Sequence, residues 1–206
     1  MIMFLGTPRA HKGLIALDEA LRQLGDSRCV LHILGASPQQ RRDFLPALQY
    51  KNLRIDGFVH WRDAPRALAC ADLVCIIQDT DFAIASTQTP AKVTDALAMN
   101  VPILANWTPP LEELASLGAL RIIEDHALAG AIRTAASGSG SKIRTERVFR
   151  EHFSYRVNSR RLQDSIREAE RAPGALAELL ADMNAYCLGR DAPPQRRPSS
   201  GGDGLG

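Results

Sequence analysis

The chain contains 206 residues, of which 45% are hydrophobic and 23% are charged, a balance typical of a globular domain with one substantial core. Its formal net charge is only +2 at pH 7, so neither a nucleic-acid-binding protein nor a broadly basic membrane-binding surface is indicated. We expect one domain followed by a tail, and no nucleic-acid partner.

The cysteines and the amino-terminal segment indicate in which cellular compartment the protein is expected. Cys29, Cys70, Cys75 and Cys187 show no CxxC spacing, which opposes both a zinc site and a disulfide framework. The opening MIMFLG has no charged n-region and no cleavage site, and therefore predicts a strand and not a signal peptide. No run of eighteen apolar residues occurs. We expect a reducing, cytoplasmic location, with peripheral attachment to the cytoplasmic face of a membrane as the alternative.

The first third of the chain predicts a β-α-β unit. A buried strand is expected at Ile2 to Leu5, a loop at Gly6 to Gly13, and then a helix with leucines at helical spacing that stops at Gly25. A second strand follows at Cys29 to Leu34. Further helices are expected at Pro38 to Leu48 and Asp63 to Cys70, and further strands at Leu53 to Ile55 and Leu73 to Ile77.

The polar stretch Gln78 to Gln88 looks too irregular for a regular element, which makes it a candidate binding loop. After it, Thr89 and Pro90 predict a helix with threonine as N-cap and proline in the first helical position. Asn100 is suited to end that helix in the left-handed conformation, before a buried strand at Val101 to Ala105.

Two charged residues of this helix suggest a binding site. Lys92 and Asp95 are three positions apart and share one face. A helix start near the carboxyl ends of parallel strands favours anions, and Asp95 could accept hydrogen bonds from the two hydroxyl groups of a ribose. The alternative is an ordinary surface ion pair between Lys92 and Asp95.

The remaining elements complete an α/β pattern. The two prolines of NWTPPLEEL precede a helix, a sixth strand is expected at Ala119 to Ile123, and a helix at Ala127 to Ala136 is closed by the flexible Ser137 to Ser141. Strands alternate with helices over about 135 residues, which predicts a Rossmann-like, doubly wound, mostly parallel sheet with ligands at the carboxyl ends of its strands.

The carboxyl-terminal part predicts added helices and a tail. We expect polar helices at Lys142 to Ala172 that complete a domain of residues 1–172, an amphipathic helix within residues 173–188, and a disordered Pro/Gly/Ser-rich tail over residues 189–206. The amphipathic helix, Gly174 to Leu188, has one apolar face, formed by Leu176, Leu179, Leu180, Met183 and Cys187. This face is expected to pack on its own domain, on a second copy in a homodimer, or on a missing half of the protein.

The loop GTPRAHKG is a second candidate site. Arg9 and Lys12 bracket a turn at the end of the first strand, and Gly13 opens the helix, so phosphate is the natural ligand. The loop matches neither a P-loop nor a GxGxxG fingerprint, and two solvated charges are the alternative. The five histidines show no metal-ligand spacing, so we expect no metal site. They are His11, His32, His60, His126 and His152.

Six segments in order carry a family resemblance: GTPRAHKGL, VLHILG, LRIDGFV, ACADLVCI, TPAKVTDALAMNVPILA and RIIEDHALAGAI. Over roughly residues 1–165 the chain resembles the carboxyl-terminal domain of GT-B glycosyltransferases of family 4, the glycosyl transferases group 1. The resemblance implies one Rossmann-like half of a GT-B fold. Such a half binds a nucleoside-diphosphate sugar without a metal or other cofactor, and transfer retains configuration. A separate amino-terminal half binds the acceptor.

The resemblance also implies roles for individual residues. Lys12 matches the diphosphate-binding lysine of the family, and Asp95 stands where a glutamate binds the ribose. Phe58 and Val59 match the segment that meets the base, and Thr87 occupies the position near the transferred sugar. The expected diphosphate site as a whole consists of Gly6, Arg9, Lys12, Gly13, Pro90 and Lys92.

The chain departs from the family pattern at three positions. Thr7 stands where the family arginine follows the glycine, so Arg9 substitutes for it by proximity only. The E-x7-E pair of the family reads Thr87 and Asp95, which removes the first carboxylate, and Asn100 replaces the usual glycine. The lost carboxylate concerns the position of the sugar and catalysis more than it concerns nucleotide binding.

We therefore expect a glycosyltransferase donor domain, with no catalytic residue identified. The resemblance starts at residue 1, so the chain alone is expected to be an incomplete or inactive half. The acceptor-binding domain would be encoded upstream in the same gene or supplied by a separate chain. Two alternatives stay open: a non-catalytic nucleotide-binding or interaction module derived from a glycosyltransferase, and a sugar-nucleotide epimerase-like enzyme. The latter would require paired glutamates and histidines that the sequence does not display.

Overall fold

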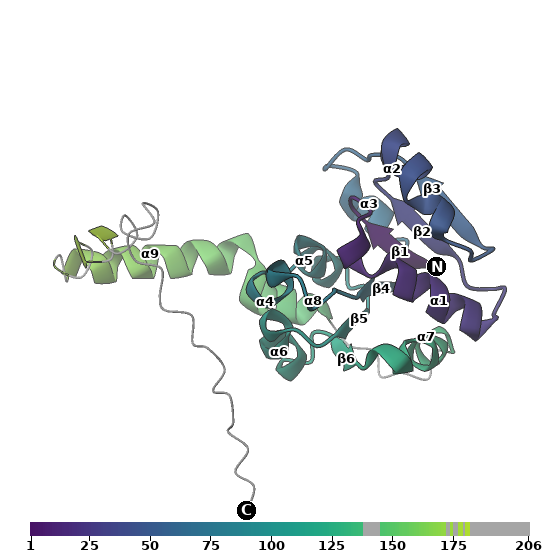
Figure 1. Ribbon diagram of the computed structural model, residues 1–206. Helices are drawn as coiled ribbons and strands as arrows, with labels where there is room; N and C mark the ends of the chain where they lie inside the picture. Colours follow the sequence, from purple (N-terminus) through teal and green to yellow (C-terminus); the bar gives the residue numbers. More distant parts are fainter. Residues whose placement is uncertain (138–144, 172–173, 175–176, 179, 182–206) are drawn as a thin grey trace, which may run out of the picture. The chain divides into compact units, whose positions relative to one another are not determined.

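The computed structural model describes residues 1–137, 145–171, 174, 177–178 and 180–181, and its centre is a six-stranded sheet (Figure 1). All neighbouring strands are parallel, in the order β3-β2-β1-β4-β5-β6. This arrangement confirms the predicted Rossmann-like α/β fold. The strands are β1 (Ile2–Leu5), β2 (Leu31–Leu34), β3 (Leu53–Asp56), β4 (Leu73–Ile76), β5 (Ile103–Asn106) and β6 (Arg121–Ile123).

Strand order creates a switch point between β1 and β4. The chain winds outward from β1 to β3 on one side and from β4 to β6 on the other, so the crevice between β1 and β4 is where such sheets bind ligands. Four residue pairs join β1 to β2, whereas β1 and β4 pair only through Ile2 with Leu73 and Met3 with Val74. The ladder between β1 and β4 is therefore confined to the amino-terminal half of β1.

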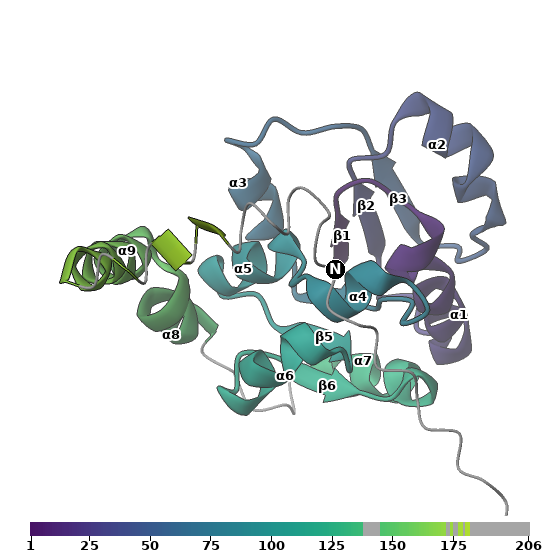
Figure 2. The same cartoon turned by 60° about the vertical axis from the view of Figure 1, so that its left-hand side comes forward.

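Helices cover both faces of the sheet, which explains the nearly continuous apolar sequence of its strands. Phe4 points into one core cluster, together with α1 (Leu14–Leu24) and α7 (Leu128–Ala136), which contact each other. Met3 points into the opposite cluster, which contains side chains of the three helices on the other face (Figure 2). These helices are α3 (Ala64–Leu68), α5 (Ala91–Ala98) and α6 (Pro109–Ser116).

Two segments differ from the predicted elements. The helix expected at Pro38 to Leu48 is split into α2 (Pro38–Asp43) and a 3-10 turn (Leu45–Ala47), because Pro46 has no amide hydrogen and disfavours a helical residue before it. The stretch Gln78 to Gln88, predicted to be irregular, contains the short helix α4 (Ala83–Thr87). Two further 3-10 turns are Ala10–Lys12 and Asp125–Ala127.

The polar helices predicted at Lys142 to Ala172 are present as α8 (Thr145–Val148), a π-helical turn (Phe149–Phe153) and α9 (Tyr155–Arg171). The chain forms two compact units, residues 1–157 and 158–206, with the boundary inside α9. Of the predicted helix 174–188, the structure describes residues 174, 177–178 and 180–181, all helical. The homodimer face on that helix and the tail 189–206 otherwise lie outside the described residues. None of the helices in the described part has the length and apolar character needed to cross a bilayer.

Candidate functional site

A cavity of about 340 Å³ opens at the carboxyl ends of β1 and β4, the switch point of the sheet. Three segments line it: the loop after β1, the residues after β4, and the first turns of α5. The lining residues are Leu5, Gly6, His11, Lys12, Gln78, Ile84, Gln88, Pro90, Ala91, Lys92 and Asp95. The three stretches that the sequence singled out as candidate sites therefore all contribute to one cavity.

The loop after β1 is held tightly against the end of β4. Gly13 has φ 65°, and a Cβ atom at this position would lie 2.4 Å from the backbone oxygen of Ile77. Only glycine fits here without displacing β4. Within the loop, the Lys12 ammonium group donates a hydrogen bond to the Thr7 carbonyl at 3.0 Å. Burial, and secondarily the positive charge of Arg9, lowers the pKa of Lys12.

A main-chain hydrogen bond also joins the two loops that flank the cavity. The amide of Asp79, after β4, donates to the carbonyl of His11, after β1, at 3.0 Å. The His11 ring lies 5.0 Å from the Phe82 ring. The two walls of the cavity are therefore connected to each other as well as to the sheet.

Helix α5 begins one residue later than predicted. Pro90 is the N-cap residue, with φ −61° and ψ 131°, and no side chain caps the first turn. The predicted role of Thr89 as N-cap was wrong, because its hydroxyl group donates to the Pro110 carbonyl at 3.4 Å and not to α5. The amides at the start of α5 consequently add positive potential at the cavity wall.

Lys92 reaches from α5 into the crevice between β1 and β4. Its ammonium nitrogen lies 4.4 Å from the centre of the Phe4 ring, a cation–π contact. Burial, and secondarily the charge of Lys12, lowers the pKa of Lys92 to about 8. Among residues 1–137 and 145–171 no carboxylate lies within ion-pair distance of it. The alternative of a surface ion pair between Lys92 and Asp95 is therefore wrong.

Asp95 lies one turn further along α5 and also lines the cavity. Although Asp95 is an exposed residue, partial burial of its carboxyl group raises its pKa. The cavity thus has two ammonium groups and one carboxylate.

The other candidate residues do not line the cavity. Arg9 is exposed, yet close enough to lower the pKa of Lys12. Phe58, in the loop after β3, is 87% exposed, whereas Val59 packs against the core. The Thr87 hydroxyl group donates to the Ala83 carbonyl within α4, at 3.1 Å.

His11 was not chosen as a site residue, and Gln78 was included only in the candidate binding loop Gln78 to Gln88, without a role of its own. His11 was interpreted as an ordinary solvated or core imidazole, although it lies between Arg9 and Lys12 in a loop already chosen as a site. Gln78 is the first polar residue after the buried strand β4, and the tendency of ligands to bind at strand carboxyl ends could have identified it. In the part of the chain that the structure describes, no cluster of three or more side chains suited to a metal ion occurs.

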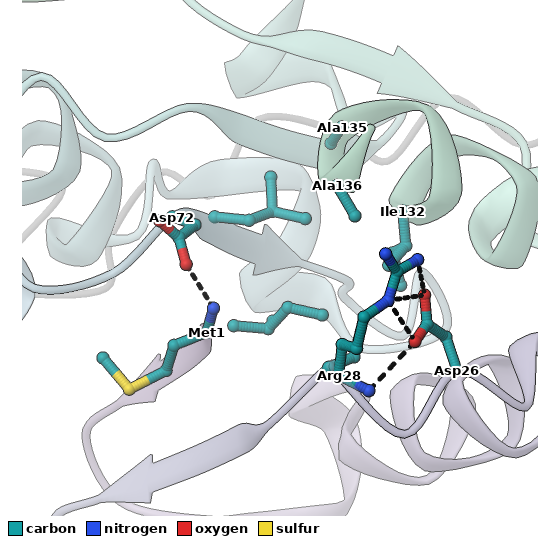
Figure 3. A pocket seen from close by; sticks show the side chains of 10 residues that line it. Met1, Asp26, Arg28, Asp72, Ile132, Ala135 and Ala136 are labelled. Atoms are coloured by element: carbon teal, nitrogen blue, oxygen red, sulfur yellow. Dashed lines mark hydrogen bonds and ion pairs between the residues drawn. The ribbon is translucent and has the colours of Figure 1, made fainter. Parts of the chain in front are cut away.

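A second cavity, of about 370 Å³, lies at the opposite edge of the sheet, where β1 and β4 begin (Figure 3). Its charged groups are paired with one another: Arg28 with Asp26 at 2.7 Å, and the terminal amine of Met1 with Asp72. The Arg28 guanidinium group lowers the pKa of Asp26 to about 2. Unlike the first cavity, this one has no lysine among its lining residues that could attract an anion. It also lies where the strands begin, and parallel sheets of this kind bind ligands where the strands end.

Comparison with known proteins identifies the family. The family described as Glycosyl transferases group 1 matches residues 1–137, and the chain belongs to this family. Among curated proteins no match is found.

Solved glycosyltransferases share the fold. HepE from Anabaena, in complex with UDP, is 18% identical with a TM-score of 0.64, over 81% of this chain and 48% of that one. A glycosyltransferase from Rickettsia africae is 18% identical with a TM-score of 0.63, over 81% and 47%. The carboxyl-terminal domain of LpcC from Francisella tularensis is 16% identical with a TM-score of 0.52, over 70% and 79%. The chain thus spans about half the length of the first two.

Proposed function

We propose that the chain is the nucleoside-diphosphate-sugar-binding half of a GT-B glycosyltransferase. The observation that carries the proposal is the cavity at the switch point, where Lys12 and Lys92 bring two ammonium groups together with no carboxylate in ion-pair contact with Lys92 among the described residues. Membership of the family supports it, as do the structures of HepE solved with UDP and with UDP-glucose. A doubly charged diphosphate is the ligand that would compensate both lysines.

The roles of the individual residues follow from charge and position. Lys12, Lys92 and the uncapped start of α5 after Pro90 would stabilise the diphosphate as it leaves, with Arg9 at the rim and without a metal ion. Gly6, whose Cβ position is open, would let the ligand approach the main chain closely, and Gly13 would hold the loop against Ile77. Asp95 would accept from the ribose hydroxyl groups, and the loop containing Phe58 and Val59 would meet the base.

Transfer requires an acceptor, and we propose that the cavity edge of the domain faces a separate acceptor-binding domain. This domain would lie upstream in the same gene or on another chain, and transfer would retain configuration. Large apolar side chains are exposed in the segments that follow β3, β4 and β5, all at this edge: Phe58, Trp61, Phe82, Ile84 and Trp107. The chain spans about half of the solved glycosyltransferases, which supports a missing half. Similarity to the GtfA/B complex, with a TM-score of 0.54, is consistent with a partner chain.

One observation favours a second candidate, a nucleotide-binding module that does not catalyse transfer. Thr87 stands where the resembled family has a carboxylate, and its hydroxyl group bonds within α4 and does not line the cavity. The position of the sugar would then lack its anchor, whereas the diphosphate site would remain.

Calorimetric titration of the chain with UDP, GDP and ADP tests the proposal, with uridine as the control that lacks phosphate. We expect binding of at least one nucleoside diphosphate and much weaker binding of uridine. Absence of binding to all three would overturn the proposal. A tighter fit of UDP-glucose than of UDP would favour the donor domain, and equal affinity would favour the non-catalytic module.

A further inference from the structure

The main chain of Gln78, two residues after β4, is held by two hydrogen bonds to one side chain. The side chain of Asn106, at the end of β5, accepts from the Gln78 amide at 2.9 Å and donates to the Gln78 carbonyl at 2.7 Å. Asn106 is itself 6% exposed, so both hydrogen bonds are shielded from water. This double contact sets the direction in which the Gln78 side chain leaves the backbone, and that side chain lines the cavity with Lys12 and Lys92.

The side-chain amide nitrogen of Gln78 is a buried donor without a partner in the part of the chain that the structure describes. Its Nε2 atom is buried and makes no hydrogen bond to any of the described residues. Native proteins satisfy the great majority of buried polar atoms, because an unpaired one destabilises the fold. An apolar side chain of similar size would avoid this cost. Among the described residues, buried side-chain atoms without a hydrogen-bond partner also include His32 Nδ1 and Thr108 Oγ1. Neither of these residues lines this cavity.

We infer that the Gln78 side-chain amide donates a hydrogen bond to a phosphate oxygen of the nucleotide, and that Asn106 positions Gln78 for this contact. The inference rests on the proposed function, and it adds a binding residue and a positioning residue to the site. Phosphate is the acceptor because the amide shares its cavity with two ammonium groups, which attract an anion to the same place. The terminal torsion of glutamine is soft, so the N–H groups can turn to the ligand while the backbone stays fixed.

The test compares Gln78→Met with the parent chain by calorimetry, using UDP and inorganic pyrophosphate as probes. Methionine keeps the length of the side chain and removes its donors. We expect an affinity loss of about ten-fold for both probes, because a hydrogen bond to a charged group is lost. The thermal unfolding midpoint without ligand should be unchanged or higher, because an unsatisfied donor has been removed. Gln23→Met, at an exposed position of α1 outside the cavity, is the matched control and should bind like the parent.

Each outcome decides between distinct explanations. If the parent binds UDP or pyrophosphate and Gln78→Met binds equally well, the inference about Gln78 fails while the proposed function stands. A loss for UDP with unchanged pyrophosphate binding would contradict the phosphate contact. If the parent binds neither pyrophosphate nor any of UDP, GDP and ADP, the proposed function itself fails. Should Gln78→Met unfold, Gln78→Glu preserves the size of the side chain, and its negative charge should weaken both probes by more than ten-fold.

Asn106→Leu tests the positioning role, because leucine has nearly the size of asparagine, carries no charge and removes both hydrogen bonds to the Gln78 main chain. We expect weaker UDP binding in the parent background. In the Gln78→Met background the same change should cause no further loss of affinity, because Asn106 acts through Gln78. Equal losses in both backgrounds would show that Asn106 has only a general structural role.

Discussion

The ammonium group of Lys92 lies 4.4 Å from the centre of the Phe4 ring, in the crevice that opens where the ladder between β1 and β4 ends. A cation–π contact compensates only part of the free energy of removing a charge from water. Because no carboxylate among the described residues offsets the rest, this lysine destabilises the ligand-free fold. Such a cost at one residue is typical of a site shaped for a ligand.

Replacing Lys92 with methionine should therefore stabilise the chain and impair its binding. We expect Lys92→Met to raise the free energy of unfolding at pH 7 by about 1 to 3 kcal/mol, since the buried charge is lost while the apolar stem remains. UDP affinity should fall at least ten-fold. Urea denaturation and calorimetry measure the two effects. Lower stability of the variant would mean that Lys92 is a structural residue.

The lowered pKa of Lys92 should also make the free energy of unfolding depend on pH. The pKa of Lys92 is about 8 in the folded chain, against an ordinary value of 10.5. Between these values the unfolded state binds more protons than the folded state, so this residue makes stability rise as the pH increases from about 8 toward 10.5. The stability difference between Lys92→Met and the parent should accordingly shrink over that range. A difference independent of pH would contradict the lowered pKa.

Lys12→Ala separates binding from folding at the other lysine. The Lys12 ammonium group makes one hydrogen bond to a carbonyl of its own loop, so its removal should change stability little. Loss of a charge-assisted phosphate contact should weaken UDP by about 1.5 to 3 kcal/mol. The exposed Lys51, changed to alanine, controls for net charge. Equal UDP affinity of Lys12→Ala and the parent would remove Lys12 from the site.

Asp95→Asn should weaken the binding of ligands that contain a ribose, and not the binding of pyrophosphate. A neutral amide retains the shape of the side chain but accepts less strongly from ribose hydroxyl groups. We expect modestly weaker binding of UDP, unchanged or tighter binding of pyrophosphate, and an intact fold, since burial already raises the pKa of this carboxyl group. A large fall in the ligand-free melting temperature would instead identify Asp95 as structural.

Two glycines with the same backbone conformation provide a matched pair. Gly13 and Gly25 both have φ 65°, but a Cβ atom would meet Ile77 only at Gly13, and nothing within 4 Å at Gly25. Gly25→Ala should cost about 1 kcal/mol from the left-handed backbone alone. Gly13→Ala should cost roughly 2 kcal/mol more, because β4 or α1 must shift. Similar melting temperatures for the two variants would show that the contact with Ile77 is readily relieved.

The parts of the fold that depend on local pattern were predictable from the sequence. Leucines at helical spacing identified α1, and short apolar runs identified all six strands, because both signals depend on neighbouring residues. The conformation of Asn100, with φ 56°, was also predicted. Helix α4 was not, since a helix of only five residues is unstable on its own and depends on tertiary contacts such as those with α6.

The site was predictable only as a set of strand ends and loops. Lys12, Lys92 and Asp95 were predicted to share a site, and all three line one cavity because the topology brings the ends of β1 and β4 together. Gln78 could not be given a role, since its fixed backbone depends on Asn106, 28 residues away in the chain. The contact of Lys92 with Phe4 likewise arises from packing and has no local signal.

The links between the loops around the cavity affect how a ligand would be received. Asn106 fixes Gln78, the His11 carbonyl holds Asp79, and Gly13 lies against Ile77, so three independent contacts order the walls before any ligand arrives. Little conformational entropy then remains to be lost on binding. We therefore expect a preorganised binding site, with a favourable binding enthalpy. The association rate should be set by diffusion and by attraction between opposite charges.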